Sequence, residues 1–275
     1  MPAFFRALPA SAKWACAILL VLAVWFLIAP YTSPHDARNP DWDRPSEAPN
    51  VQYGHYFGTD AIGRDLYQRT AAGGRLSLIV GLTAAVAALL IGTLYGAIAG
   101  FYGGSLGEAM MRLVDLLATL PFLLFVIFVL TLFTPSLSLL IVLLASYGWL
   151  DVARVVRVEA QALMAKTYMR AGEVLGLSAP RQLFVHLLPN LAPFALLALA
   201  IALPNAVLME SFLSFLGVSP AEAQGSLGAL LAEGMQDREY APWALLFPAA
   251  LLTLLLYSLQ ELTDGVRDVL EQQRT

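Results

Sequence analysis

The sequence predicts an all-α polytopic membrane protein with about six transmembrane helices. Of its 275 residues, 59% are hydrophobic and only 13% are charged, and the mean hydropathy is +0.69. An ordinary soluble domain has a smaller apolar fraction and a larger charged one. Crossing the ~30 Å hydrocarbon layer takes about 20 mostly apolar residues. Five stretches without charged side chains lie within Trp14–His35, Leu76–Gly107, Leu116–Leu150, Leu187–Met209 and Tyr240–Gln260.

The third stretch is too long for a single crossing. At a rise of ~1.5 Å per residue, a helix over Leu116–Leu150 would measure about 50 Å. Pro135, between Thr134 and Ser136, removes a backbone donor and restricts the residue before it. We therefore expect two spans, near Leu116–Phe133 and Leu137–Leu150, of which the second, the fourth crossing of the chain, is the shortest.

These spans divide the chain into three parts. Residues 1–30 hold the N-terminal segment and the first transmembrane helix, residues 31–75 form an external loop, and residues 76–271 form a five-helix core with a cytoplasmic loop at 151–186. With the N-terminus inside, the cytoplasmic segments hold ten Lys and Arg residues and the external segments six. Because positive charge concentrates on the cytoplasmic side, we expect both termini there. The first span lacks a small-x-small cleavage site before Pro30, which favours a retained helix over a cleaved signal peptide.

Several function classes are disfavoured by what the sequence contains. The net charge of -4 gives no basic surface of the kind that binds nucleic acid. Cys16 is the single cysteine, and His35, His55 and His186 share no helical spacing, so we expect no metal site. The chain has no glycine-rich phosphate loop and no nucleophile elbow. We expect it to bind no cofactor, so that any nucleotide chemistry belongs to another chain.

The external loop ends in a turn motif. Glycine and aspartate at these intervals are typical of tight turns closed by side-chain hydrogen bonds to the backbone. We favour a turn that anchors the start of the second span, and ligand binding is the alternative. The residues of this motif are Gly58, Thr59, Asp60, Gly63, Arg64 and Asp65.

The loop at 151–186 is the most informative segment. Asp151–Lys166 indicates a helix that protrudes from the membrane, and Gly176 ends a second, short helix. Apolar residues follow at 183, 184, 187 and 188, which indicates a further helix. The short helix exposes Ala171, Gly172 and Val174. Small apolar residues on a projecting helix suit insertion into the cleft of a partner, and a solvent-facing connector is the alternative.

This loop resembles the cytoplasmic signature of binding-protein-dependent ABC permeases. That signature reads Glu-Ala-Ala, then Gly four residues after the second Ala, then a later Leu-Pro. Ala171, Gly176, Leu188 and Pro189 match it, whereas Arg170 replaces the Glu and Gly172 replaces the second Ala. Glu173, about one helical turn from Arg170, is a candidate for the missing acidic contact. The resemblance implies an ATPase-coupling segment made of Met169, Arg170, Ala171, Gly172, Glu173, Gly176 and Leu177.

Further segments resemble the C-type subunits of dipeptide, oligopeptide and nickel permeases. The similarity covers residues 14 to 271, its motifs keep the order found in that group, and it is strongest to oligopeptide permease C subunits. Leu227 departs from the group, which tends to carry Trp there. The similar segments are Gly58–Asp65, Ser146–Arg157, Glu210–Gly217, Ala241–Trp243, Phe247–Pro248 and Asp264–Asp268.

The resemblance implies the type I ABC importer permease fold and a transport subunit that is not itself an enzyme. Such a subunit pairs with a homologous permease in the bacterial inner membrane. It docks two cytoplasmic ATPases that use ATP and Mg, and it receives a peptide from an external binding protein. Rigid-body motion of the spans then switches a central cavity between the two faces. The alternatives are an ion-coupled secondary transporter, or an ABC importer of nickel or another non-peptide solute.

Glu210 is the strongest candidate for an ionisable group inside the membrane. A buried charge in lipid costs about 3 kcal/mol or more on insertion scales, so such residues are usually paired or line a pathway. One interpretation places Glu210 on the peptide path. The favoured interpretation is a structural pair with Arg75 or Arg238 near the external face.

Overall fold

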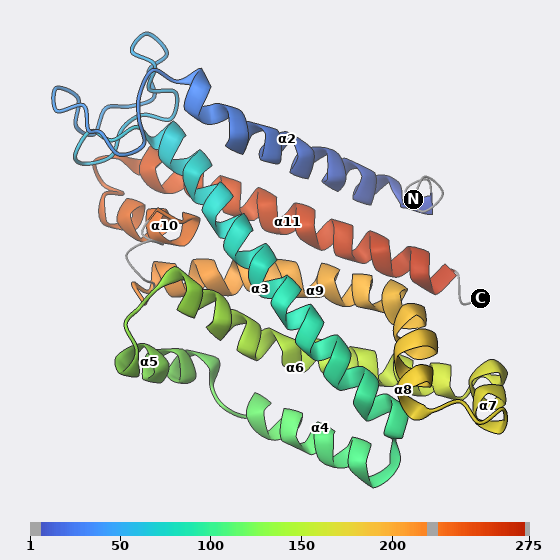
Figure 1. The fold of residues 1–275 in the computed structure, drawn as a ribbon. Coiled ribbons are helices and arrows are strands. Elements are labelled where there is room, and N and C mark those ends of the chain that lie inside the picture. Colours follow the sequence, from blue (N-terminus) through green and yellow to red (C-terminus); the bar gives the residue numbers. More distant parts are fainter. Residues whose placement is uncertain (1–6, 219–224, 273–275) are drawn as a thin grey trace.

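A computed structural model describes residues 7–218 and 225–272. Its long helices lie side by side in one bundle, with the loop that follows α2 at one end and the last turn of α11 at the other (Figure 1). In chain order the elements are α2 (Ala10–Thr32), α3 (Leu66–Tyr102), α4 (Gly104–Ala118), α5 (Phe122–Leu132), α6 (Leu137–Met164), α7 (Thr167–Val174), α8 (Ala179–Arg181), a π-helical turn η1 (Gln182–Leu187), α9 (Leu188–Phe215), α10 (Leu227–Gln236) and α11 (Pro242–Gln272).

The described residues contain five helices that are long and apolar enough to cross a membrane, and the bent pair α4 and α5 makes a sixth crossing if the two helices form one span. This confirms the all-α polytopic fold. The continuous helix predicted over Leu116–Phe133 is wrong, because α4 and α5 meet at 78°. Pro121 at the bend cannot donate a backbone hydrogen bond, and it disfavours helical geometry at Leu120.

The break at Pro135 is present, but the fourth span is not the shortest. After Ser136 caps its first turn, α6 runs through Leu150 and Asp151 to Met164. The residues after Leu150 are therefore not a separate protruding helix. Val152, Val156 and Ala160 are buried on α6, so packing against neighbouring helices continues the helix past its first charged residue.

The second and sixth spans are also longer than their apolar stretches. Helix α3 begins at Leu66 rather than Leu76, because the Asp65 side chain caps it by accepting from the Gln68 N–H at 2.8 Å. The loop between α2 and α3 thus ends at Asp65, whereas the predicted boundary was residue 75. Helix α11 continues past Gln260 to Gln272.

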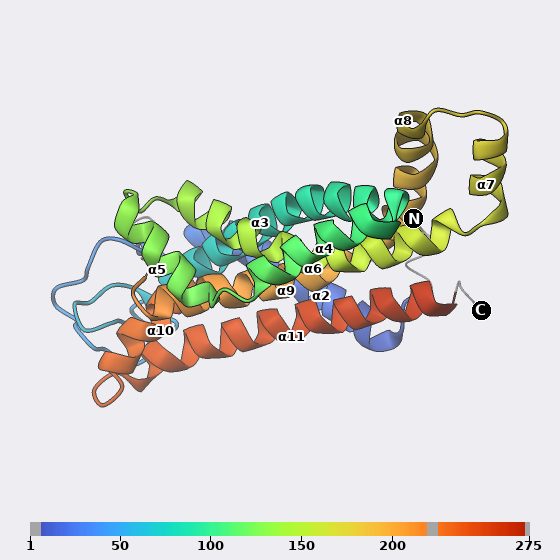
Figure 2. The same cartoon turned by 90° about the horizontal axis from the view of Figure 1, so that it is seen from below.

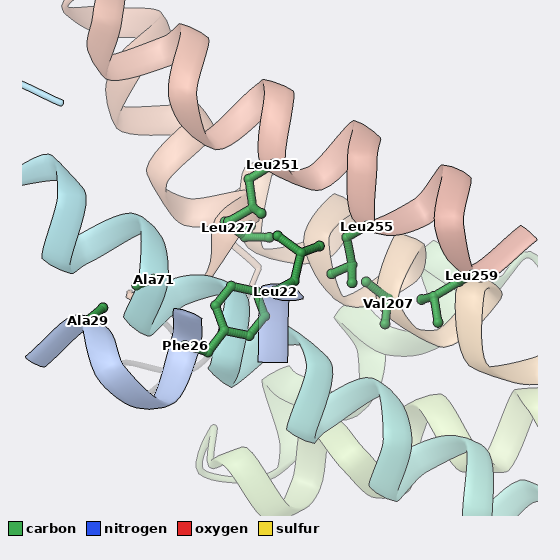
Figure 3. Packing of buried hydrophobic residues seen from close by; sticks show 9 residues of the cluster. All are labelled: Leu22, Phe26, Ala29, Ala71, Val207, Leu227, Leu251, Leu255 and Leu259. Atoms are coloured by element: carbon green, nitrogen blue, oxygen red, sulfur yellow. The ribbon is translucent and has the colours of Figure 1, made fainter. Parts of the chain in front are cut away.

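One apolar core joins the first and last spans. It contains residues from α2, α3, α9, α10 and α11, and Figure 3 shows Phe26 of α2 directed toward the leucines of α10 and α11. Burying such side chains against one another, and not only against lipid, fixes α2 to the rest of the bundle. The members are Leu22, Phe26, Ala29, Ala71, Val207, Leu227, Leu251, Leu255 and Leu259.

Helices α3 and α6 approach closely along a line of glycines. A Cβ atom on Gly96 would lie 2.5 Å from the Ala153 carbonyl oxygen, and one on Gly92 would lie 2.7 Å from that of Trp149. Small residues permit such backbone contact between membrane helices. The contact also fixes the position of α6 along α3, since Gly92 lies opposite Trp149 and Val152.

Candidate functional site

Helix α7 stands out from the end of the bundle at which α11 also ends (Figure 2). Its buried anchor is Met169, 2% exposed, which belongs to a cluster with Val156 of α6 and Leu187 of η1. At its tip, Val174 is 88% exposed and Leu175 is 79% exposed. The helix therefore combines a fixed base with a bare apolar tip.

The end of α7 has the geometry of a Schellman cap. Gly176 has φ +74°, a backbone conformation that residues with a side chain rarely adopt. The Leu177 N–H donates to the Gly172 carbonyl at 3.1 Å, and the Leu175 N–H donates to the Ala171 carbonyl at 3.0 Å. A Cβ on Gly172 would lie 3.2 Å from Leu177 Cδ1, so the capping leucine folds back over the helix that it closes.

The structure separates the predicted coupling residues into two groups. Arg170 and Ala171 are exposed, whereas Gly172 is buried. Glu173 lies within α7, but its side chain is outside the described part of the chain, so its role as the acidic contact stays a prediction. The exposed tip at Leu175 was not among the predicted residues. Its signal in the sequence is an apolar pair placed directly before the capping glycine.

A groove of about 280 Å³ lies among α3, α5, α6 and α9. Apolar and small side chains form most of its wall, including Ala84 and Ala88 of α3. Three polar residues interrupt this wall: Tyr147 and Asp151 from α6, and Asn205 from α9. A mostly apolar hollow with few polar groups is typical of a site that holds an organic molecule.

Asp151 belongs to a chain of three charges. Arg154 Nη1 lies 2.8 Å from Asp151 Oδ1, and Arg154 Nη2 lies 3.1 Å from Asp115 Oδ1 on α4. Asp151 also adjoins Val152, which packs on Gly92 within the charge-free part of α3. Charges within a membrane span pair with one another or face a water-filled cavity. Sequence reasoning missed them because it ended the span at Leu150.

Glu210 is fully buried and bonded within its own helix. The Ser214 hydroxyl donates to Glu210 Oε1 at 2.8 Å, and the Ser211 hydroxyl donates to Oε2 at 3.3 Å. The expected pair with Arg75 or Arg238 is not found among the described residues, and Arg238 instead contacts Glu239. Hydroxyls four and one residues away stabilise the carboxyl group locally, so no arginine needs to reach it.

The turn motif at Gly58–Asp65 is tied to two helices by a network of charges. Asp60 accepts from Arg64 Nε and from Arg69 Nη1, each at 2.6 Å. Both arginines also contact Glu233 of α10, at 2.8 Å from Arg64 Nη2 and 3.0 Å from Arg69 Nη2. The network joins the loop to α3 and α10.

Backbone contacts complete this anchor. Gly58 and Gly63 have φ +77° and +86°, which allows two tight turns. The Trp243 Nε1–H donates to the Thr59 carbonyl at 3.0 Å, and His55 Nδ1 lies 2.8 Å from Asp65 Oδ2. Together with the Asp65 cap, these contacts fix the first turn of α3.

Comparison with known proteins gives a consistent family. Residues 92–274 match the family described as binding-protein-dependent transport system inner membrane component. The chain is 40% identical over 262 residues to the oligopeptide transport system permease protein OppC of Haemophilus influenzae, covering 94% of this chain and 84% of that protein. It is 41% identical to OppC of Escherichia coli K12, and the match covers 92% of this chain and 84% of that protein. It is 36% identical to the dipeptide transport system permease protein DppC of Bacillus subtilis, covering 92% and 79%.

Proposed function

The chain belongs to the family of binding-protein-dependent transport system inner membrane components, and on that premise we propose that it is one permease subunit of an ATP-driven importer of oligopeptides or dipeptides. The substrate class follows from the names of the relatives that match over most of their length. The partners are a second, homologous permease, two cytoplasmic ATPases that use ATP and Mg, and an external peptide-binding protein. The chain itself performs no covalent chemistry.

The exposed apolar tip of α7 is the observation that carries this proposal. Helix α7 projects from the bundle (Figure 2), and Val174 and Leu175 at its end are almost fully exposed. An amphipathic helix that inserts apolar side chains into a groove is a recurring mode of protein recognition. A cleft on each ATPase is the partner that this tip fits.

The base of α7 connects that contact to the transport path. Met169 packs with Val156 of α6 and with Leu187, which leads directly into α9. Closure of the ATPases pushes α7, and the buried contact passes the displacement to α6 and α9. These two helices line the groove with α3. Packed elements move as rigid bodies, so the push opens the groove to one face and closes it to the other.

The groove forms half of the peptide path. Its apolar wall tolerates varied side chains, and Tyr147, Asp151 and Asn205 offer hydrogen bonds to a peptide backbone. The Asp115, Arg154 and Asp151 charges then face the water of the path or the second permease.

This function fixes the orientation of the chain. ATPases act in the cytoplasm, so α7 lies on that side. The first turn of α2 and the last turn of α11 lie at the same end of the bundle as α7 (Figure 1). Both termini are then cytoplasmic, and the loop between α2 and α3 faces outward from the bacterial inner membrane.

Co-purification from the native host tests this function. The tagged chain should recover a second permease and ATPase subunits in mild detergent, identified by mass spectrometry. Leu175→Asp should lose the ATPases and keep the second permease. Val51→Asp, at an equally exposed apolar residue of the external loop, should keep both. Recovery of no ATPase with any form would refute the importer and favour an ion-coupled transporter.

A further inference from the structure

An open, arginine-rich cleft lies at the external end of α3. Its volume of about 820 Å³ is large enough for a small organic molecule, and Arg38, Arg64, Arg69, Arg75 and Glu233 line it. Neither the transport path nor the coupling segment uses this cleft.

The cleft carries unbalanced positive charge. Arg64 and Arg69 are neutralised by Asp60 and Glu233. In the ranges 7–218 and 225–272, no ion pair joins Arg38 or Arg75 to an acidic side chain. Two arginines therefore remain available to an anion, and a planar guanidinium pairs well with phosphate.

An exposed apolar stripe runs along α3 from Arg75 toward the C-terminus of the helix. Arg75 and the four stripe residues follow one another at spacings of four, three, four and four residues, which puts their side chains on one helix face. From Ile79 to Leu90 the stripe measures about 16 Å, close to half of the ~30 Å hydrocarbon layer. Ala84 and Ala88, which line the transport groove, lie on the opposite face of α3 and are buried. The stripe consists of Ile79, Leu82, Val86 and Leu90, all exposed.

We propose that this cleft and stripe bind one anionic phospholipid of the outer leaflet. Its phosphate contacts Arg38 and Arg75, and an acyl chain lies along Ile79, Leu82, Val86 and Leu90. The unpaired charge selects an anion, and an apolar track one leaflet long selects an anion that carries an acyl chain. The assignment to the outer leaflet rests on the orientation proposed above.

Thermal unfolding of the purified complex tests the headgroup contact. Phosphatidylglycerol should raise the unfolding midpoint more than phosphatidylcholine with the same acyl chains, and inorganic phosphate at equal concentration should not. The double variant Arg38→Gln, Arg75→Gln should lose most of the difference between the two lipids. Arg238→Gln, an external arginine outside the cleft, should keep it. An unchanged difference in the double variant would overturn the proposal, as would an equal effect of inorganic phosphate, which would mean a soluble anion site.

Site-specific crosslinking tests the occupant without altering the arginines. In a Cys16→Ala background, Ile79→Cys carries a photoreactive label on a chain that otherwise has no cysteine. Labelled membranes should yield a phospholipid adduct in preference to a protein adduct. A crosslink mainly to the second permease would assign the stripe to a subunit interface and overturn the proposal. Both lipid readouts work without bound ATPase, so their failure is distinguishable from failure of the importer function.

Discussion

Arg69 is the clearest case of a single side chain that holds two elements together. It is 7% exposed and contacts both Asp60 and Glu233. Removing one member of a buried charge network leaves the others desolvated and unpaired, which costs more than the pair itself contributes. The arginine is therefore structural, although it lines the same cleft as Arg75.

We predict that Arg69→Met destabilises the fold by about 2 to 4 kcal/mol, because Asp60 stays buried and loses one of its two arginine partners, each at 2.6 Å. Thermal unfolding in detergent measures the effect as a fall of several degrees in the midpoint. Arg267→Gln breaks only an exposed contact with Glu271 and should change stability by less than about 0.5 kcal/mol. Equal effects of the two substitutions would contradict the structural role of Arg69.

Asp41 is expected to make the loop between α2 and α3 less stable in acid. Burial alone raises the pKa of Asp41, but the hydrogen bond from the Asp43 N–H, the His55 ring 3.6 Å away and the charge of Arg44 outweigh it and hold the pKa below its ordinary value. A lowered carboxyl pKa in the fold contributes stability above the pKa of the unfolded chain, about 4, and loses it as the pH falls further. Hydrogen exchange, corrected for intrinsic rates, should show the Asp43 amide losing protection below about pH 4. Asp41→Asn should abolish that dependence, and a dependence that persists in Asp41→Asn would assign it to another group.

At the scale of elements, the contact between α3 and α6 depends on glycine. A Cβ on Gly96 would meet the Ala153 carbonyl at 2.5 Å and Val156 Cβ at 3.0 Å. A Cβ on Gly148 would meet only Ala88 Cβ, at 3.3 Å. The two helices position the groove, so their separation also sets its width.

We predict that Gly96→Ala destabilises the protein by about 1 to 3 kcal/mol through overpacking. Gly148→Ala should be neutral or stabilising by up to about 1 kcal/mol, because alanine favours helix over glycine. Unfolding midpoints in one detergent compare the two variants directly. A Gly96→Ala midpoint at or above that of the wild type would show that the helices are not in backbone contact there.

The length and apolarity of segments were sufficient to predict the spans, but not their ends. Pro135 broke the chain where expected, because a proline in a run of apolar residues is a local signal. Charged residues were treated as span ends, and this moved the predicted boundaries at Asp115 and Asp151. Those carboxylates share Arg154 across two helices, a tertiary contact that a single sequence does not reveal.

The candidate site likewise has features that the sequence predicts and features that depend on packing. Gly176 and the family signature predicted a coupling segment at α7, since a capping glycine and a fixed spacing are visible in the sequence. The burial of Gly172 and the exposure of Leu175 depend on how α7 packs against α6 and η1, which only the structure shows. The sequence identified Glu210 as a buried charge and predicted a distant arginine as its partner. Its partners are the nearby hydroxyls of Ser211 and Ser214.

At the scale of the whole molecule, the fold places its regions along one axis. The loop with its arginine cleft lies at one end, the groove lies between the spans, and α7 lies at the other end with the last turn of α11 (Figure 1). In the proposed importer, an ATPase contact at α7 reaches the groove through α6 and α9. We therefore expect force to enter the molecule at the α7 end and substrate to enter at the opposite end.

Peptide uptake by the purified complex in proteoliposomes tests this account most directly. A labelled oligopeptide, delivered with its binding protein, should accumulate only when ATP reaches the cytoplasmic face, and Leu175→Asp should abolish accumulation without preventing insertion of the chain. Uptake that persists without ATP and follows an ion gradient would contradict the account and identify an ion-coupled transporter.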